Sequence, residues 1–464
     1  MRRVEKEVEP ATRKRGNSDR MAFVAEETWS EVRSGQICAF QTGSTDTVLV
    51  PALGGKQELE VKIEKLETIW FEEQFNTLWL RIHTDEGLVG LGETYYVPRA
   101  VAAVIHDVFA NLLVGRSVFD IENHWNNMFA TVNFFGFAGA ETRAISTVDV
   151  ALWDLLGQYT GQPIYNVLGG RNRDRIPIYN TCVSHGPHMD YHAWAEGRAG
   201  ELAQALLDSG IRAMKIWPWD QFGVSLGGPV GQRAGVGAVG PVGHYLDPDD
   251  LKRGLEPVQQ IRAAVGDKMQ IAIEGHARWN LPIAIDIGRA LEEYDIMWLE
   301  EIIPPDNVDS YARLAAATKV PICVSERLFT RFGFRQVVEK NAAHIVMPDM
   351  AWTGGLTETR KIVALADTYY LPFTTHDTIG PVALWSAAHL AAHAPNAMIM
   401  ETVRAYTEGW YNDVMTERLV IRDGHLEFPD RPGLGTALRP EVLTRSDVHV
   451  EVSDASSLKD VSTG

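Results

Sequence analysis

Three glutamates stand at equal spacing in the second half of the chain. Glu274, Glu300 and Glu326 each close a short apolar run, and 26 residues separate each from the next. One strand–helix unit has about this length, so the three positions fall at one height on neighbouring strands. Carboxylates that converge cannot all stay ionised without a cation, and an all-oxygen ligand set suits Mg²⁺, with Mn²⁺ as a substitute. The spacing predicts a divalent metal site rather than three solvated glutamates.

Further polar residues close the next apolar runs. Asp349 and His376 lie 27 residues apart, and Glu401 closes the last run. A carboxylate that faces a histidine fixes its tautomer and raises its basicity, so Asp349 and His376 are predicted to form a general acid/base pair. The alternative for His376 is a structural histidine. Glu401, if protonated, would hydrogen-bond a substrate carboxylate or a developing enediolate; otherwise it supports the site indirectly.

The elements that must position these residues begin near Ile176. Helical patterns separate eight short apolar runs, at residues 176–182, 213–217, 269–274, 296–300, 321–326, 344–349, 372–376 and 398–401. Such alternation indicates parallel βα units, and eight units suggest a closed barrel with its site at the carboxyl ends of the strands. An open doubly wound sheet is the alternative. Before this region, residues 77–84 and 88–94 predict a hairpin, and apolar spacing over 145–156 predicts a helix that stops at Gly161.

Composition restricts the class of protein. The 464 residues are 45% hydrophobic and 22% charged, which is typical of globular proteins of more than one domain. The net charge of −18 argues against nucleic acid and anionic membrane surfaces as partners. Cys38, Cys182 and Cys323 form no CxxC pair, there is no long apolar run, and the charged N-terminus lacks secretory features. These features favour a cytoplasmic protein. With this net charge, a small-molecule carboxylate could be a substrate only beside a local cation or a metal ion, which the predicted divalent metal site would provide.

Several motifs together resemble the enolase superfamily, and within it the mandelate racemase/muconate lactonizing enzyme-like branch. The resemblance covers residues from about 60 to 440. The motifs that carry it are the hairpin end Gly-Leu-Gly-Glu93, the segment Ser146–Asp154, Leu168-Gly-Gly170, Trp298-Leu-Glu-Glu301, Ser325-Glu326-Arg327, Pro348-Asp349, Gly354–Glu358 and Pro432–Gly435.

The resemblance implies an α/β fold, a (β/α)8-type (modified TIM) barrel with an α+β capping domain. It implies Mg²⁺ ligands at Glu274, Glu300 and Glu326, an acid/base dyad of Asp349 and His376, and an assisting carboxylate at Glu401. Barrels of this family usually form homo-oligomers, dimers or octamers. The expected organisation is an N-terminal extension (1–58), capping domain (59–172), barrel (173–405), return to the capping domain (406–440) and polar tail (441–464).

Two positions depart from the family pattern. Glu274 stands where Asp is common, which lengthens the arm but keeps oxygen chemistry. Racemases of the branch carry Lys-x-Lys on the second strand, whereas Lys215 is followed two residues later by Trp217. Loss of the second base makes simple racemisation less favoured. Lys215 is expected to interact with the substrate carboxylate, with a structural lysine as the alternative.

Other residues are expected to line the site. His276 follows the first ligand by two residues, as in some acid-sugar dehydratases of the branch, and is a candidate second acid/base or a packing residue. Substrate contacts are expected from Trp217, Arg278, Trp352, Tyr95 and Tyr96. Aromatic residues at 133–137 are typical of a closing loop.

The resulting functional hypothesis is a lyase. A base would remove the proton α to a carboxylate, water would leave from the β-carbon, and an aldonate or aldarate would become a 2-keto-3-deoxy acid. The alternatives are an epimerase or cycloisomerase that uses the same enediolate, and a non-catalytic metal-binding barrel.

Two further patterns are discounted. The GxGxxG match at residues 235–240 follows no strand, so a dinucleotide fold is not indicated; residues 222–243 are expected to form a gating loop. His185, His188 and His192 have zinc-like spacing, but a zinc site there is not favoured.

Overall fold

A computed structural model describes residues 37–41, 47–51, 61–222 and 242–458. Contacts divide the chain into residues 1–58 and 59–464. In the first unit, β1 (Ile37–Gln41) and β2 (Thr47–Pro51) pair as an antiparallel hairpin. Nearly all of the expected gating loop, and the GxGxxG match within it, lie outside the described residues.

The capping domain is built on an antiparallel sheet in the order β17-β3-β4-β5. Strands β3 (Ile63–Phe71), β4 (Thr77–Thr84) and β5 (Val89–Tyr95) are consecutive, and β4 and β5 form the predicted hairpin. Its turn needs a left-handed residue, which Gly87 provides at φ +82°. The hairpin prediction is therefore confirmed.

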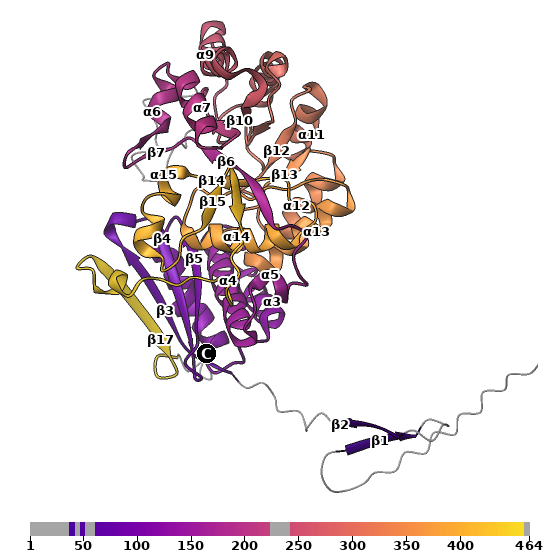
Figure 1. Cartoon of the computed structure of the whole chain (residues 1–464), viewed down its shortest axis with the longest axis vertical. Helices are drawn as coiled ribbons and strands as arrows, with labels where there is room; N and C mark the ends of the chain where they lie inside the picture. The colour runs from indigo at the N-terminus through magenta and orange to yellow at the C-terminus, as the bar shows by residue number, and fades with distance from the viewer. Residues whose placement is uncertain (1–36, 42–46, 52–60, 223–241, 459–464) are drawn as a thin grey trace, which may run out of the picture. The chain divides into compact units, whose positions relative to one another are not determined.

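Strand β17 (Val448–Asp454) corrects the interpretation of residues 441–464 as a polar tail. It pairs antiparallel with β3 from Val448↔Phe71 to Asp454↔Lys65, and Figure 1 shows the yellow strand beside the indigo one. A short 3-10 helix, η5 (Pro440–Thr444), precedes it. The strand lies at the edge of the sheet and most of its side chains are exposed. The sequence therefore shows no alternation of buried and exposed residues that would have indicated a strand.

Helices cover one face of this sheet, above all the predicted helix, α4 (Ala140–Thr160), which ends at Gly161 with φ +65°. Close contact with β5 requires glycine, because a Cβ at Gly92 would lie 1.9 Å from the carbonyl oxygen of Thr147. The other helices of this region are α1 (Pro98–Val104), η2 (Ile105–Phe109), α2 (Ala110–Leu113), α3 (Ile121–Val132) and α5 (Ile164–Val167).

The second region is a closed barrel, which confirms the predicted fold and excludes the open sheet. Parallel pairing runs from β14 through β6 to β13, and bridges from Phe373 to Val346 and to Ala397 complete the ring. Seven of the eight predicted runs contain strands, and the run at 372–376 forms only the Phe373 bridges. The strands are β6 (Arg175–Thr181), β9 (Ala213–Ile216), β10 (Gln270–Glu274), β11 (Trp298–Glu300), β12 (Ile322–Val324), β13 (Ile345–Val346) and β14 (Met400–Thr402).

Helices surround the barrel (Figure 1). They are α6 (Asp190–Ala195), α7 (Ala199–Asp208), α9 (Pro248–Val265), α10 (Leu281–Leu291), α11 (Val308–Ala317), α12 (Thr330–Glu339), α13 (Gly355–Thr368) and α14 (Pro381–His393). Most bury one face, whereas α14 is buried from Pro381 to Ala392. A helix that is apolar all round must be covered on every side.

Strand alternation directs side chains into the barrel. The interior layer consists of Tyr179, Ala213, Ala272, Trp298, Cys323, Ile345, Met347 and Ile399. Glu274 follows Ala272 by two residues and Glu300 follows Trp298 by two residues, so both carboxylates also point inward, one layer nearer the carboxyl ends.

The capping domain and the barrel share an extensive polar joint along α4. Ser146 Oγ accepts the Gly354 N–H (2.9 Å), and Asp149 accepts the Thr357 N–H (2.8 Å). Asp154 accepts the N–H groups of Leu434 (2.8 Å) and Leu91 (2.9 Å). Four of the sequence motifs, which lie far apart in the chain, therefore meet at this joint.

The segment after the barrel returns along both regions. Short helices α15 (Arg404–Thr407) and α16 (Tyr411–Val414) are followed by an antiparallel hairpin of β15 (Val420–Arg422) and β16 (His425–Glu427). Because β16 pairs antiparallel with β6, this part of residues 406–440 adds to the barrel rather than to the capping domain.

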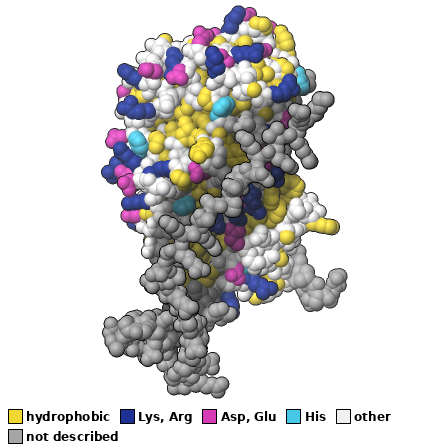
Figure 2. Space-filling view, turned by 90° about the vertical axis from the view of Figure 1, so that its right-hand side faces the viewer, with side chains coloured by type: hydrophobic (Ala, Val, Ile, Leu, Met, Phe, Trp, Pro, Cys, Tyr) yellow, Lys and Arg dark blue, Asp and Glu magenta, His cyan; other side chains and the backbone are white. Residues whose placement is uncertain are grey.

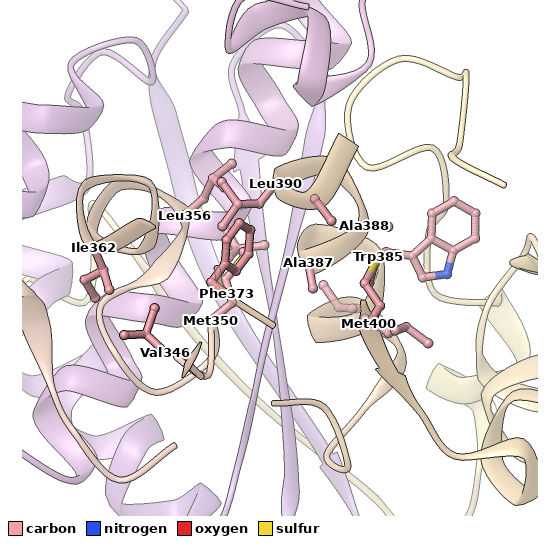
Figure 3. Close-up of a cluster of buried hydrophobic side chains, with 14 of the residues drawn as sticks. Val346, Met350, Leu356, Ile362, Phe373, Trp385, Ala387, Ala388, Leu390 and Met400 are labelled. Atoms are coloured by element: carbon pink, nitrogen blue, oxygen red, sulfur yellow. The ribbon is translucent and has the colours of Figure 1, made fainter. Parts of the chain in front are cut away.

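Acidic and basic side chains are interspersed on the upper part of the face in Figure 2, so the net negative charge is not gathered there. None of the helices in the described ranges has the length and hydropathy needed to span a membrane. Figure 3 shows the packing between the barrel wall and its outer helices, where Phe373 of the barrel lies near Leu356 of α13 and Leu390 of α14.

Candidate active site

Lys215, near the end of β9, lies among three carboxylates at the carboxyl ends of the barrel strands. Its Nζ is 2.5 Å from Glu300 Oε1, 2.8 Å from Glu401 Oε1 and 3.4 Å from Glu274 Oε2. Burial opposes its charge, but Glu300 and Glu401 raise the pKa of Lys215 well above its ordinary value. Lys215 is therefore held as a buried cation.

Glu274 and Glu300 end adjacent strands, and their surroundings shift the two pKa values in opposite directions. Glu274 Oε1 accepts the N–H groups of Gly275 (3.0 Å) and His276 (2.7 Å), and Glu300 Oε2 accepts from Trp298 Nε1 (2.7 Å). Despite burial, His276 and other donors hold the pKa of Glu274 below its ordinary value. Burial and the charge of Glu274 raise the pKa of Glu300 well above its own.

Two further glutamates lie beside this pair. Glu326 Oε1 is 3.5 Å from Arg327 Nε, while its Oε2 is buried without a hydrogen-bond partner in the described part of the chain. Both oxygens of Glu301 are likewise buried without such a partner among the residues described, and Arg327 Nε lies 3.8 Å away. The sequence analysis assigned no role to Glu301.

The donor set fits an Mg²⁺ ion in kind. The oxygens are carboxylates, they are buried, and several have no hydrogen-bond partner in the described ranges, which is costly unless a cation is near. As the side chains stand, however, no three His, Cys, Asp or Glu residues in the described ranges are gathered closely enough to hold an ion. The metal site therefore stays a prediction.

His376 and Asp349 form the predicted pair. Nδ1 of His376 donates to Asp349 Oδ2 at 2.6 Å, and the other carboxylate oxygen accepts the Ala351 N–H at 2.8 Å. Burial disfavours the imidazolium, but the hydrogen bond to Asp349 and the charge of Glu401 raise the pKa of His376 above its ordinary value. The Nε2 atom lies 3.3 Å from Thr378 Oγ1.

Glu401 is positioned on β14 by three groups. Oε1 accepts from Lys215 and from the hydroxyl of Thr181, and Oε2 accepts the Asp377 N–H at 2.7 Å. Burial opposes ionisation, yet Lys215 and His376 hold the pKa of Glu401 below its ordinary value. These contacts favour the carboxylate and disfavour the protonated form that the sequence analysis considered.

A second aspartate–histidine pair lies across the barrel. His276 Nδ1 is 2.6 Å from Asp220 Oδ2, and the two residues follow β10 and β9. These strands are on the opposite side of the ring from the strand positions that carry Asp349 and His376. The sequence analysis identified His276 but missed Asp220, because 56 residues separate the two and Asp220 ends no apolar run.

The expected substrate-contact residues fall into two groups. Tyr95 and Tyr96 pack together (4.6 Å between ring centroids), Tyr96 lies 5.7 Å from Trp352, and Trp352 lies 5.1 Å from the His376 ring. On the other side, Trp217 lies 5.8 Å from the His276 ring. Arg278 is 1% exposed and contributes positive charge near Asp220. The loop residues Phe134, Phe135 and Phe137 are exposed.

Arg143, in the first turn of α4, also reaches this region and was missed. Its Cζ lies 4.1 Å from the Trp352 ring centroid, and Nη1 donates to the Tyr95 carbonyl at 3.0 Å. An arginine within a helix gives no sequence signal that it lies beside residues of the barrel site.

The histidines with zinc-like spacing do not converge. His188 Nε2 is 3.0 Å from Glu408, His192 Nδ1 is 3.2 Å from Glu196, and His185 packs against Tyr406. Cys182 and Cys323 are buried, and burial raises the pKa of both thiols.

Comparison with known proteins agrees with this architecture. Residues 71–169 match the family model "Mandelate racemase / muconate lactonizing enzyme, N-terminal domain", and residues 198–442 match "Enolase C-terminal domain-like". A D-xylonate dehydratase of Haloferax volcanii is 30% identical over 83% of this chain and 88% of its own length. A D-galactonate dehydratase of Variovorax paradoxus is 31% identical over 82% and 93%.

Solved structures show the same relationship. An enolase of the mandelate racemase subgroup from Agrobacterium tumefaciens is 39% identical, with a TM-score of 0.75 over 86% of this chain and all of that one. An enolase protein from Sargasso Sea environmental sequencing is also 39% identical, with a TM-score of 0.75 over 85% and 99%. The chain belongs to the enolase superfamily, in its mandelate racemase/muconate lactonizing enzyme-like branch.

Proposed function

We propose that the protein is an acid-sugar dehydratase, a hydro-lyase that converts an aldonate or aldarate into a 2-keto-3-deoxy acid. The relatives named D-xylonate and D-galactonate dehydratase support this reaction class. The single observation that carries the proposal is the 2.6 Å bond between His376 and Asp349 beside a cluster of buried carboxylates and one lysine.

His376 is the proposed base. Asp349 holds its Nδ1, so Nε2 is the atom that takes the proton α to the substrate carboxylate. The imidazolium then donates that proton to the hydroxyl that leaves from the β-carbon, as a general acid. In this syn elimination one residue does both tasks, and the enol product ketonises to the 2-keto-3-deoxy acid.

His276 provides the second route. Its position across the barrel, with Nδ1 held by Asp220, suits protonation of a hydroxyl that leaves from the opposite face, as an anti elimination requires. Lys215 contributes fixed positive charge for the substrate carboxylate.

Mg²⁺ is the proposed cofactor, with Mn²⁺ as a substitute, and Glu274, Glu300 and Glu326 are its proposed ligands. When bound, the ion supplies Lewis-acid stabilisation of the negative charge that develops on the substrate carboxylate. Trp217, Trp352, Tyr95 and Tyr96 shape the surrounding site and exclude water.

A screen of an acid-sugar library with Mg²⁺ tests the proposal, with α-keto acid products detected as semicarbazones. Formation of a 2-keto-3-deoxy acid from any member supports the dehydratase. An epimer or a lactone product would instead favour an epimerase or cycloisomerase. Absence of solvent deuterium exchange at the α-carbon of every acid would favour a non-catalytic barrel.

We further infer a cytoplasmic homo-oligomer, a dimer or octamer, that acts on a small molecule rather than on nucleic acid or a membrane. The free thiols of Cys182 and Cys323 support the cytoplasmic assignment, and the net charge of −18 argues against nucleic acid and anionic membranes. The oligomeric assignment rests on the family alone. Sedimentation of the purified protein measures the oligomeric state.

A further inference from the structure

Arg143 is a cation of the capping domain that is connected to the proposed catalytic histidine through the ring of Trp352. Its guanidinium lies 4.1 Å from the Trp352 ring centroid and 5.8 Å from that of Tyr96, and Trp352 in turn contacts the His376 ring. Nη1 is fixed by the Tyr95 carbonyl. The charge of Asp349 also acts on this guanidinium, so Arg143 belongs to the same electrostatic environment as the dyad.

Most of the other arginines that stack on aromatic rings have a carboxylate partner, which Arg143 lacks among the described residues. Each of four has a carboxylate partner: Arg253 pairs with Asp250, Arg331 with Glu358, Arg360 with Glu122, and Arg445 with Asp447 and Glu73. Arg143 is partly buried, yet it forms no salt bridge with any carboxylate in the described ranges. Arg99, which stacks on Trp70, is also without one but is exposed.

A planar guanidinium held between aromatic rings favours a carboxylate, because it offers parallel N–H donors to both oxygens. The proposed site already provides positive charge for the carboxylate at which the α-proton is removed, through Lys215 and the proposed ion. Arg143 lies on the side of His376 that faces the capping domain. A second cation there suits a substrate with a second negative end.

We propose that Arg143 binds the terminal carboxylate of an aldarate, a sugar diacid, and so makes aldarates the preferred substrate class over aldonates. This inference rests on the proposed dehydratase function. Arg143 acts as a specificity residue. The dehydration itself is unchanged: the C–H bond at C2 and the C–O bond at C3 break, and water leaves.

The test compares acids that differ only at the terminal carbon: galactarate with D-galactonate, and D-glucarate with D-gluconate. Both turnover with Mg²⁺ and binding, read from tryptophan fluorescence because Trp352 contacts Arg143, are measured for the wild-type protein and for Arg143→Gln. In at least one pair, we expect the wild-type protein to bind and turn over the aldarate about tenfold better or more. Arg143→Gln should lose that preference, because turnover and binding of the aldarate should fall more than those of the aldonate, and Arg143→Lys should restore part of it.

Arg445→Gln is the matched control, since Arg445 stacks on Phe71 and has its own carboxylates. It should leave the ratio unchanged. If acid sugars are dehydrated but Arg143→Gln leaves the aldarate-to-aldonate ratio unaltered, or no aldarate is preferred, the inference is overturned and the dehydratase stands. If no acid is dehydrated but aldarate binding still depends on Arg143, the proposed reaction and the substrate preference fail, and only the binding of a carboxylate by Arg143 is supported.

Discussion

Two histidines at the site have the same local arrangement. His376 and His276 each hold a buried aspartate 2.6 Å from Nδ1, one through Asp349 and the other through Asp220. Sequence reasoning predicted the first pair because both members end apolar runs one βα unit apart. Of the second pair it identified only His276. Asp220 lies in a loop, and a loop has no hydrophobic periodicity from which its position could be predicted.

Replacement of His376 tests the proposed base. His376→Asn removes the atom at Nε2, so turnover should fall at least about a hundredfold, the usual contribution of a positioned acid/base. Metal content, measured by atomic emission after dialysis, should stay at the wild-type level because His376 is not a proposed ligand. Turnover close to wild type would contradict the assignment.

Replacement of Asp220 tests whether His276 takes part in the reaction. Asp220→Asn keeps the size of the side chain but removes the acceptor charge that fixes the ring, so kcat should fall about tenfold or more, with KM less affected. Asp220→Glu should recover part of kcat. An unchanged kcat in Asp220→Asn would show that His276 only packs against Trp217.

The residues missed by sequence reasoning share one cause. Glu301, Asp220 and Arg143 are not the residues that close the predicted apolar runs. Glu301 comes one residue after such a position, Asp220 lies in a loop, and Arg143 lies on a helix of the capping domain. Spacing identifies residues that end strands, but it does not report which loops and helices converge on them.

At the level of elements, some of the motifs that resemble the family stabilise the contact between the two domains rather than form the candidate site. Ser146, Asp149 and Asp154 of α4 bind backbone N–H groups of Gly354, Thr357 and Leu434 rather than the candidate site. The barrel strands and the hairpin could be predicted because the burial of their side chains gives the sequence a recognisable pattern of apolar residues. Strand β17 could not, because its exposed edge position gives no such pattern.

Loss of Asp154 tests the strength of this joint. Asp154 is buried, and burial raises its pKa to about 6 although it accepts two backbone N–H groups. Asp154→Ala leaves both donors without an acceptor, and we expect the protein to lose about 2–4 kcal/mol of stability. Urea denaturation measures this loss. The exposed Asp174→Ala should cost less than about 0.5 kcal/mol, and equal effects would contradict the role of the joint.

For the whole molecule, the barrel with its cap followed from the order and number of apolar runs, whereas the contact between the two domains did not. Helix α14 illustrates the difference. Its residues from Pro381 to Ala392 are buried between the barrel and its surroundings, so it carries no polar face from which an orientation could be predicted. Its His389 is fully buried and donates Nε2–H to the Leu434 carbonyl of the returning segment at 3.0 Å.

The buried His389 predicts an acid-sensitive joint between these segments. Burial lowers its pKa from 6.5 to about 4, so between these values the unfolded chain binds the extra proton and stability falls as the pH decreases. Above pH 6.5 both states are neutral and the contribution is fully present; at pH 5 about 2 kcal/mol should be lost. His389→Gln keeps an N–H donor but does not titrate, so its urea midpoint should fall less between pH 7.5 and pH 5 than that of the wild-type protein. His192→Gln, at a half-exposed histidine, should retain the wild-type pH dependence. If His389→Gln shows it too, the pH sensitivity arises elsewhere in the molecule.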